Sequence, residues 1–507
     1  MPARTGKCIN FGLCNKADSK EVFTLAERQE FVCSECKKPL QPLDLPRFPK
    51  KAIIGFAFLL SVAFALGYFL WPDPNGSLGD SVVGPVSRGT VILRLSGSNT
   101  IGAVLAPALA EEFLKQLGAT NVKSERGSKE DELQVQGMLP GDSSPKAIEI
   151  HAHGSATAFE DLEKGLCDIG MASRKIKPEE TTRLAGLGDM TSPASEHILG
   201  LDGIAVIVNK GNPIETLTKE QVARAFSGET KDWMELGGIR GRISVYARDD
   251  KSGTYDTFKT LVLGSRQLLS NAKRLEDSRE LSSSVSKDPN GIGFIGLPYV
   301  QDAKAVAVSE GGTRPFLPNH FTVSTEDYAL SRRLFFYTPW NPPNDFTRKF
   351  VNFALSRQGQ DVVEKIGFIG QNVSPTQSTE IPSDAPEQYR KLTKGSDRLS
   401  LDFRFRTGSS DLDNKALADL DRVVTFLIDL HYTGQNILLF GFADSTGTNA
   451  VNDTLSRNRA DSVAQQFNLR GVTPFAVAGF GSQLPVASND IADGREKNRR
   501  VEIWLKR

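Results

Sequence analysis

Four of the five cysteines lie within the first 36 residues, at Cys8, Cys14, Cys33 and Cys36. Four thiolates can close a tetrahedral zinc site, and bound zinc can hold a module that is too small for a core of its own. The Cys-x-x-Cys spacing of the second pair fits a zinc knuckle, whereas five residues separate the first pair. We therefore predict a structural zinc ribbon. The alternatives are a redox pair at Cys33 and Cys36, which lacks a thioredoxin-like strand–helix context, and free or lipidated thiols.

Three loops in the middle of the sequence place hydroxyl side chains and glycines at expected helix starts. The loops 96–100, 153–157 and 248–258 each follow a strand-like run and precede a helical run. Unpaired N–H groups at a helix start, nearby hydroxyls and the helix dipole can together bind a tetrahedral anion. An N-cap is the plainer interpretation of any single loop, but three loops in one domain favour an oxyanion site. Arg248 could add a bidentate, charge-assisted contact.

A carboxylate and a guanidinium lie fifteen residues apart near the end of the sequence. Asp444 occupies a glycine-rich turn after a strand-like run, and Arg459 occupies a helical run. The pair offers one group that only accepts hydrogen bonds and one planar group that only donates them. The plainer alternative makes Asp444 an Asx-turn residue and Arg459 a solvated helix charge.

One apolar segment determines the expected topology. Residues 52–71 are twenty residues without a charge, which matches a hydrocarbon core of about 30 Å. Lys50 and Lys51 precede the segment, and Asp73 follows it. The positive-inside bias therefore predicts a single-pass signal-anchor in the inner membrane of a bacterium, with a cytoplasmic N-terminus and the bulk of the chain in the periplasm. A cleaved signal peptide is the alternative, but the run is long and a cysteine-rich module precedes it.

Composition and pattern divide the chain into modules. The 61 basic and 61 acidic residues balance, which argues against a general nucleic-acid binder. Strand–helix alternation in the middle region predicts α/β layers with a mainly parallel sheet, and the last region reads as a compact α+β domain. The expected order is a zinc-ribbon-like module (1–46), a transmembrane helix (52–71), a linker (72–88), an α/β domain (89–376), a second linker (377–398) and an α+β domain (399–507).

Residues 91–376 resemble the phosphate-type substrate-binding proteins of ABC transporters. The resemblance is carried in order by GSNTI, GSATAFEDLEKGLCDIGMASRKIKPEE, LDGIAVIVNKGNPIETLTKEQVARAFSGETKDW, YARDDKSGTYDTF and GIGFIGLPYV. It implies a two-lobed α/β periplasmic-binding-protein fold (type II) with the ligand in the cleft, and an ABC permease as a partner. By position, the family's ligand contacts fall on Ser98, Thr100, Ser155, Arg248, Ser252, Gly253 and Thr254.

The loop after DIG departs from part of that family. Some phosphate binders place an acidic acceptor there, which recognises protonated phosphate. This chain has MASRK, with Ser173 and Arg174. A hydroxyl followed by a cation would tolerate a fully ionised anion, so we expect phosphate or a similar oxyanion and count Ser173 among the contacts.

Residues 399–507 resemble the OmpA C-terminal-like peptidoglycan-binding domain. The resemblance is carried by GFADSTGT, NDTLSRNRADSV, GFGSQLPVASND and GREKNRRVEIWL. In that family a turn aspartate and a helix arginine grip diaminopimelate of the stem peptide, and these positions are Asp444 and Arg459 here. Diaminopimelate presents an ammonium and a carboxylate on one end, which suits this pair. Asn452 is expected to hold the loop or to add a contact, and Ala443 stands where family members often have threonine.

The sequence thus predicts a non-enzymatic, membrane-tethered protein that binds an oxyanion and peptidoglycan. The alternative is an envelope scaffold whose middle domain has lost its ligand and serves as a protein-interaction module. A serine acyltransferase is not expected, because Lys251-Ser252-Gly253 precedes Ser284-x-x-Lys287, the reverse of the usual motif order. No P-loop motif is present, so ATP hydrolysis would need a partner.

Overall fold

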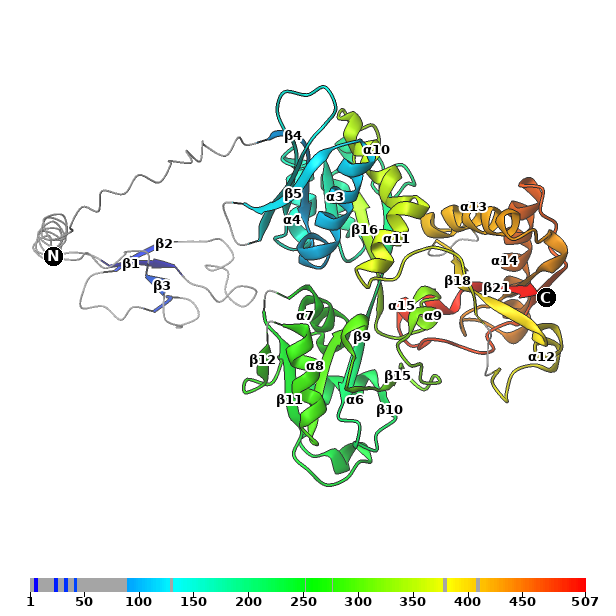
Figure 1. Ribbon diagram of the computed structural model, residues 1–507. Coiled ribbons are helices and arrows are strands. Elements are labelled where there is room, and N and C mark those ends of the chain that lie inside the picture. The colour runs from blue at the N-terminus through cyan, green and yellow to red at the C-terminus, as the bar shows by residue number, and fades with distance from the viewer. Residues whose placement is uncertain are drawn as a thin grey trace, which may run out of the picture. The chain divides into compact units, whose positions relative to one another are not determined.

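The computed structural model describes residues 4–7, 22–25, 32–34, 41–42, 89–127, 131–250, 252–275, 277–376, 381–406 and 411–507. The chain forms two compact units, Met1–Gly84 and Pro85–Arg507. The first unit contains an antiparallel sheet with the order β2-β1-β3, made of β1 (Arg4–Lys7), β2 (Val22–Leu25) and β3 (Gln41–Pro42). The longer elements in Figure 1 belong to the second unit.

Several sequence predictions fall outside the described residues. They concern Cys8, Cys14, Cys36 and the apolar segment 52–71, while Cys33 is described and buried. None of the helices in the described ranges has the length and hydropathy of a membrane span. The same ranges contain no cluster of three metal-binding side chains. The zinc ribbon and the transmembrane helix therefore stay predictions.

The first lobe is built on three parallel strands, with β4 between β7 and β8, and an antiparallel hairpin extends them. Its strands are β4 (Thr90–Gly97), β5 (Thr120–Arg126), β6 (Glu132–Met138), β7 (Lys146–His151) and β8 (Ile169–Ala172). Its helices are α3 (Ala106–Gln116), α4 (Ser155–Glu163), α5 (Pro178–Arg183), α10 (Asp345–Leu355) and α11 (Arg357–Lys365). The apolar faces of α3 and α10 meet through Phe113 and Phe350, whose ring centroids lie 5.2 Å apart.

The second lobe repeats the parallel arrangement, with β11 between β12 and β13. Its sheet strands are β11 (Ser244–Arg248), β12 (Lys273–Leu275), β13 (Gly291–Gly296) and β14 (Lys304–Ala305), and a separate parallel pair is β10 (Thr216–Thr218) with β15 (Ala307–Ser309). Its helices are α6 (Lys219–Ser227), α7 (Gly253–Phe258), α8 (Ser278–Lys287) and α9 (His320–Ser324). A separate core forms here, in which Phe258 stacks on Phe294 at 4.0 Å.

Two strands join the lobes. The first half of β9 (Glu196–Val208) pairs with β16 (Ser331–Tyr337), and its second half pairs with β13. Both pairings are antiparallel, so one mixed sheet continues from the first lobe into the second. The prediction of a mainly parallel sheet is therefore corrected. The strands at the centre of each lobe are parallel, but the crossing strands and the hairpin pair in antiparallel fashion.

The C-terminal domain has a five-stranded sheet with the order β17-β18-β21-β19-β20. Its strands are β17 (Pro375–Thr376), β18 (Ser396–Arg404), β19 (Ile437–Gly441), β20 (Ala476–Gly479) and β21 (Arg500–Lys506). Its helices are α12 (Glu387–Thr393), α13 (Asn414–Asp429), α14 (Asn449–Leu469) and α15 (Ala492–Asn498). The linker predicted over 377–398 is also corrected, because α12 and the start of β18 lie within it.

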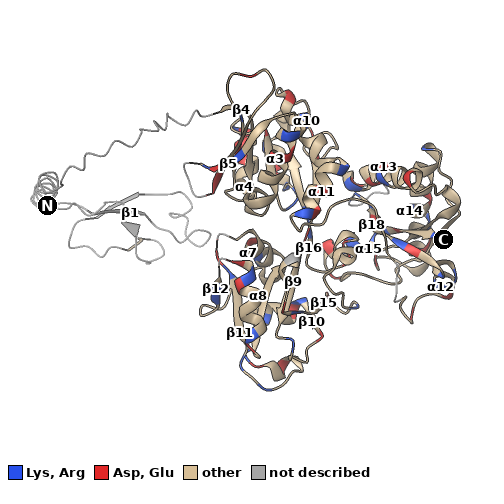
Figure 2. Ribbon diagram, in the orientation of Figure 1, with Lys and Arg blue, Asp and Glu red and all other residues tan. Residues whose placement is uncertain are grey.

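The C-terminal domain packs directly on the two-lobed domain through buried charges. Arg398 on β18 pairs with Asp327 at 3.0 Å, and Arg333 on β16 pairs with Asp413 at 2.7 Å. Arg404 donates to the carbonyl of Thr325 at 2.7 Å. Elsewhere, Figure 2 shows basic and acidic residues interspersed over both lobes and the C-terminal domain. The junction between the domains thus contains ion pairs of opposite charge rather than a surface of a single charge.

Candidate functional site

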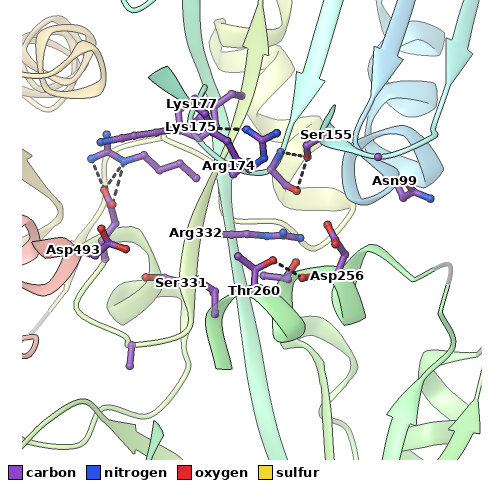
Figure 3. Close-up of a pocket in the computed structure, with 18 of the residues that line it drawn as sticks. Asn99, Ser155, Arg174, Lys175, Lys177, Asp256, Thr260, Ser331, Arg332 and Asp493 are labelled. Carbon is purple, nitrogen blue, oxygen red and sulfur yellow. Dashed lines mark hydrogen bonds and ion pairs between the residues drawn. The ribbon is translucent and has the colours of Figure 1, made fainter. Parts of the chain in front are cut away.

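A cavity of about 840 Å³ lies at the inner faces of the two lobes. The first lobe contributes Ser155 and Ser173, and the second lobe contributes Ser252 and Asp256. Arg332 enters from the crossing strand β16, and Figure 3 shows it reaching between Ser155 on one wall and Asp256 on the other. The C-terminal domain adds α15 residues at one side of the cavity: Asp493, Glu496 and Lys497.

Two buried serines form the polar wall of the first lobe. Ser155 is the first residue of α4, and Ser173 directly follows β8. Their hydroxyl oxygens lie 3.1 Å apart, and the Ser173 amide donates to the Ser155 hydroxyl at 3.0 Å. Because the loop places hydroxyls at a helix start, this wall has the donors and the dipole that stabilise an anion.

The loops that contain Thr100 and Gly253 are in direct contact. Gly253 begins α7, and a Cβ atom added to it would overlap Thr100, so only glycine allows this approach.

Ser252 caps α7 by accepting a hydrogen bond from the Tyr255 amide. Thr254 is half-buried in the first turn of α7, and Ser98 is buried with its amide bonded to the carbonyl of Met171. Of the predicted contacts, Ser155, Ser173 and Ser252 line the cavity itself.

The structure places the predicted anion contact Arg248 at the end of β11, beside β12 and α8. Its Nη1 donates to the Ser278 hydroxyl at 2.6 Å, and its Nε donates to the Leu275 carbonyl at 3.3 Å. Asp249 lies 3.6 Å from its Nη2. The guanidinium is therefore engaged next to β12 and α8, and Arg248 is not among the residues that line the cavity.

Arg332 is a cavity cation that the sequence did not predict as a contact. Its Nη2 donates to the Thr100 hydroxyl at 2.7 Å and to the Gly253 carbonyl at 3.2 Å, so it ties the two anion loops together. Its Nε and Nη2 each lie 3.3 Å from Oδ2 of Asp202 on β9. Burial lowers the pKa of Arg332. The available signal was two consecutive arginines inside an otherwise apolar strand run.

Arg174 also lines the cavity, but a carboxylate neutralises its charge. Its two terminal nitrogens donate to the two carboxylate oxygens of Glu180 at 2.7 and 2.8 Å. The hydrogen bond with Glu180 raises the pKa of Arg174. Arg174 therefore contributes a compensated charge to the wall rather than an uncompensated one.

The structure brings Asp444 and Arg459 to one end of the C-terminal sheet. Asp444 follows β19, accepts hydrogen bonds from the amide and hydroxyl of Thr446, and pairs with Arg499 at 2.9 Å. Burial raises the pKa of Asp444, but the bonds from Thr446 and Arg499 outweigh it and leave the pKa below its usual value. Asp444 is therefore held as a carboxylate in an Asx-type turn.

Arg459 lies buried on α14 with few partners. Its Nη1 donates to the Phe442 carbonyl at 3.2 Å, and its guanidinium lies 5.6 Å from the centre of the Phe405 ring. Its Nε has no hydrogen-bond partner among the described residues, and neither does Oδ1 of the buried Asn452. Burial and the positive charge of Arg499 lower the pKa of Arg459. Among the described residues, this site holds a guanidinium that makes no direct ion pair, a carboxylate, and an amide oxygen without a hydrogen-bond partner.

Family models match both domains. Residues 85–358 match the model of a PBP superfamily domain, and residues 404–499 match the model of the OmpA family. The two matches coincide with the two-lobed domain and with most of the C-terminal domain.

Two phosphate-binding proteins and one solved structure are similar to part of this chain. The phosphate-binding protein PstS of Pseudomonas aeruginosa is 31% identical over 242 residues, which are 44% of this chain and 73% of that protein. The phosphate-binding protein PstS of Staphylococcus haemolyticus is 29% identical over 254 residues, which are 48% of this chain and 77% of that protein. A solved structure of a putative phosphate ABC transporter substrate-binding protein with bound phosphate from Clostridium perfringens is 30% identical, covers 55% of this chain and 98% of that chain, and has a TM-score of 0.39.

Proposed function

Because this chain belongs to the PBP superfamily and carries an OmpA family domain after its PstS-like domain, we propose that it binds phosphate or a similar oxyanion in its cleft and peptidoglycan through its C-terminal domain. Both families consist of non-enzymatic binding proteins, and the chain is a binding protein rather than an enzyme. In the proposed arrangement, residues 52–71 anchor the chain in the inner membrane and the two domains lie in the periplasm. An ABC permease would be the partner that receives the anion.

The observation that carries the oxyanion proposal is the meeting of three hydroxyl-bearing loops around a buried guanidinium. Ser155 and Ser173 face Ser252 across the cavity, and Arg332 lies between the walls. Hydroxyls and a cation in a site shielded from water stabilise an anion more strongly than they would in bulk solvent.

The peptidoglycan proposal is supported by the unbalanced charges at the end of the C-terminal sheet. A buried guanidinium without a carboxylate is costly, and a ligand carboxylate would relieve this cost at Arg459. Asp444 would accept the ligand's ammonium. One free end of diaminopimelate carries both of these groups.

A second candidate function is an envelope scaffold whose cleft no longer binds a small ligand. It is favoured by one observation: the loops of Thr100 and Gly253 are in direct contact, and Arg332 bonds to both of them. The domain would then act as a protein-interaction module that is held to peptidoglycan.

Calorimetric titration of the full chain with inorganic phosphate distinguishes the two candidates. We expect saturable binding at one site that weakens in Ser155→Ala, because this change removes a cavity hydroxyl. Ser227→Ala is the matched control, since that hydroxyl caps the end of α6 by bonding to the Arg224 carbonyl outside the cavity. No heat and no thermal stabilisation with phosphate or sulfate would favour the scaffold.

A further inference from the structure

Arg332 has an unused donor group that faces the cavity. Its Nε and Nη2 make all four of its hydrogen bonds, to Asp202, Thr100 and Gly253. No described residue accepts a hydrogen bond from its Nη1, and this atom is not among the buried polar atoms that lack a partner. Since Arg332 lines the cavity, the two N–H groups of Nη1 are available to a bound molecule.

The charges around Arg332 leave its guanidinium only partly compensated. Asp202 on β9 reaches it at 3.3 Å, and Asp256 on α7 lines the same cavity but is exposed. Arg174 on the opposite wall is occupied by Glu180. The neighbouring Arg333 on β16 turns away and pairs with Glu326 and Asp413. The loops of Thr100 and Gly253 therefore meet at a cation that is bonded to one carboxylate, Asp202, at 3.3 Å.

The polar wall opposite Arg332 does not require a proton on the anion. The residue after β8 is Ser173, whose hydroxyl can either donate or accept a hydrogen bond. A fully ionised oxyanion can accept from Ser155 and Ser173 without meeting a carboxylate among the first-lobe residues that line the cavity.

We propose that Arg332 contacts the bound oxyanion through Nη1 and that this contact makes the site select for double negative charge. The inference rests on the proposed oxyanion function and extends it by naming a ligand class: tetrahedral dianions, sulfate as well as the dianionic form of phosphate. Arg332 would then act both on the anion and on the two loops that enclose it.

Titration of the full chain with sulfate and with inorganic phosphate tests the proposal. We expect Arg332→Gln to weaken sulfate binding by about 10- to 100-fold, because it removes a charge-assisted hydrogen bond. Arg332→Lys should fall between this variant and the unaltered chain, since a lysine keeps the charge but lacks the planar fork. Phosphate affinity of the unaltered chain should rise with pH across the second ionisation of phosphate, while sulfate affinity stays constant.

The Asp202→Asn variant distinguishes a direct contact between Arg332 and the ligand from a purely structural role of Arg332. It removes the carboxylate that compensates Arg332 but keeps an amide oxygen that can accept the same hydrogen bond. A ligand contact predicts that sulfate binds this variant at least as tightly as the unaltered chain. Equal losses in Asp202→Asn and Arg332→Gln, or unchanged affinity in Arg332→Gln, would overturn the inference while leaving oxyanion binding intact. If the unaltered chain binds neither anion, the proposed oxyanion function itself fails.

Discussion

Two largely buried arginines, Arg332 and Arg459, carry positive charge at the two proposed ligand sites. Arg459 bonds to one carbonyl and packs near the Phe405 ring, whereas Arg332 ties together two loops and keeps Nη1 unoccupied. Moving a guanidinium out of water costs roughly several kcal/mol when no carboxylate or hydrogen-bond acceptor compensates it well. At both positions, the fold maintains a charge that a bound anionic group would stabilise.

The proposed binding of peptidoglycan rests on individual side chains of the C-terminal domain. We expect Arg459→Ala and Asp444→Ala to lose cosedimentation with purified sacculi, because each removes one half of the charged pair that receives the ligand. Arg457→Ala is the matched control: it lies on the same helix, is exposed, and pairs with Asp461 at 3.0 Å. Full retention of both site variants on sacculi would contradict the assignment.

A partly buried histidine on β9, His197, gives a pH-dependent contribution to stability. Burial lowers the pKa of His197 from 6.5 to about 4, while the ring bonds to the Thr338 hydroxyl at 3.1 Å. The unfolded chain therefore takes up a proton at a higher pH than the folded chain, and stability falls as pH drops from 6.5 to about 4. This loss is about 3 kcal/mol at most.

His197→Gln should remove that part of the pH dependence, because the amide keeps a hydrogen bond to Thr338 and does not titrate. Urea unfolding of the unaltered chain and the variant across this pH range measures the effect. Parallel stability curves for the two proteins would show that His197 does not contribute.

At the scale of elements, helix α14 lies unusually close to the sheet. Gly441 ends β19, and a Cβ atom on it would overlap the Ser456 carbonyl of α14. The same helix carries Arg459, and the loop after β19 carries Asp444. The separation of the two site residues therefore depends on this glycine contact.

Gly441→Ala should push α14 away from β19 and destabilise the protein by about 1 to 3 kcal/mol through overpacking. Sacculus binding should weaken with it, because Arg459 moves relative to Asp444. Gly186→Ala serves as the control, since a Cβ there meets nothing within 4 Å. Thermal unfolding and cosedimentation together test the claim, and unchanged values for Gly441→Ala would refute it.

The sequence predicted the order of the elements better than their limits and their contacts. Strand–helix alternation and the two resemblances anticipated the lobes and the C-terminal domain. The polar composition of 377–398 concealed α12, whose Tyr389 completes an aromatic cluster with Phe440 and Trp504. Arg332 was missed because a strand buried in a sheet is expected to be apolar. Its role depends on loops more than 70 residues away, and local patterns do not report such contacts.

At the scale of the whole molecule, buried charges lock the C-terminal domain onto the two-lobed domain. Arg333 bonds to Glu326 at 2.8 Å and to Asp413 at 2.7 Å, and all three side chains are largely buried. At the side of the cavity, Lys175 of the first lobe pairs with Glu496 of α15 at 2.6 Å. The domains that would bind an oxyanion and peptidoglycan thus form one packed unit instead of two tethered ones.

Arg333→Ala should destabilise this junction by about 3 to 5 kcal/mol, because it leaves two buried carboxylates without their cation. We expect calorimetry to resolve separate unfolding of the C-terminal domain in this variant. Arg357→Ala is the control, since its pair with Asp429 spans the same junction at 3.3 Å but is exposed. That variant should differ from the unaltered chain by about 0.5 kcal/mol or less. Equal effects of the two substitutions would argue against a buried electrostatic lock.

Whether one chain carries an oxyanion to peptidoglycan can be tested directly in a single experiment. Purified sacculi are mixed with the full chain and radiolabelled inorganic phosphate, sedimented, and counted. We expect that label sediments only when the protein is present, and that it is lost both with Arg459→Ala, which frees the protein, and with Arg332→Gln, which frees the phosphate. Sedimentation of protein without label, or of label independent of both side chains, would contradict this expectation.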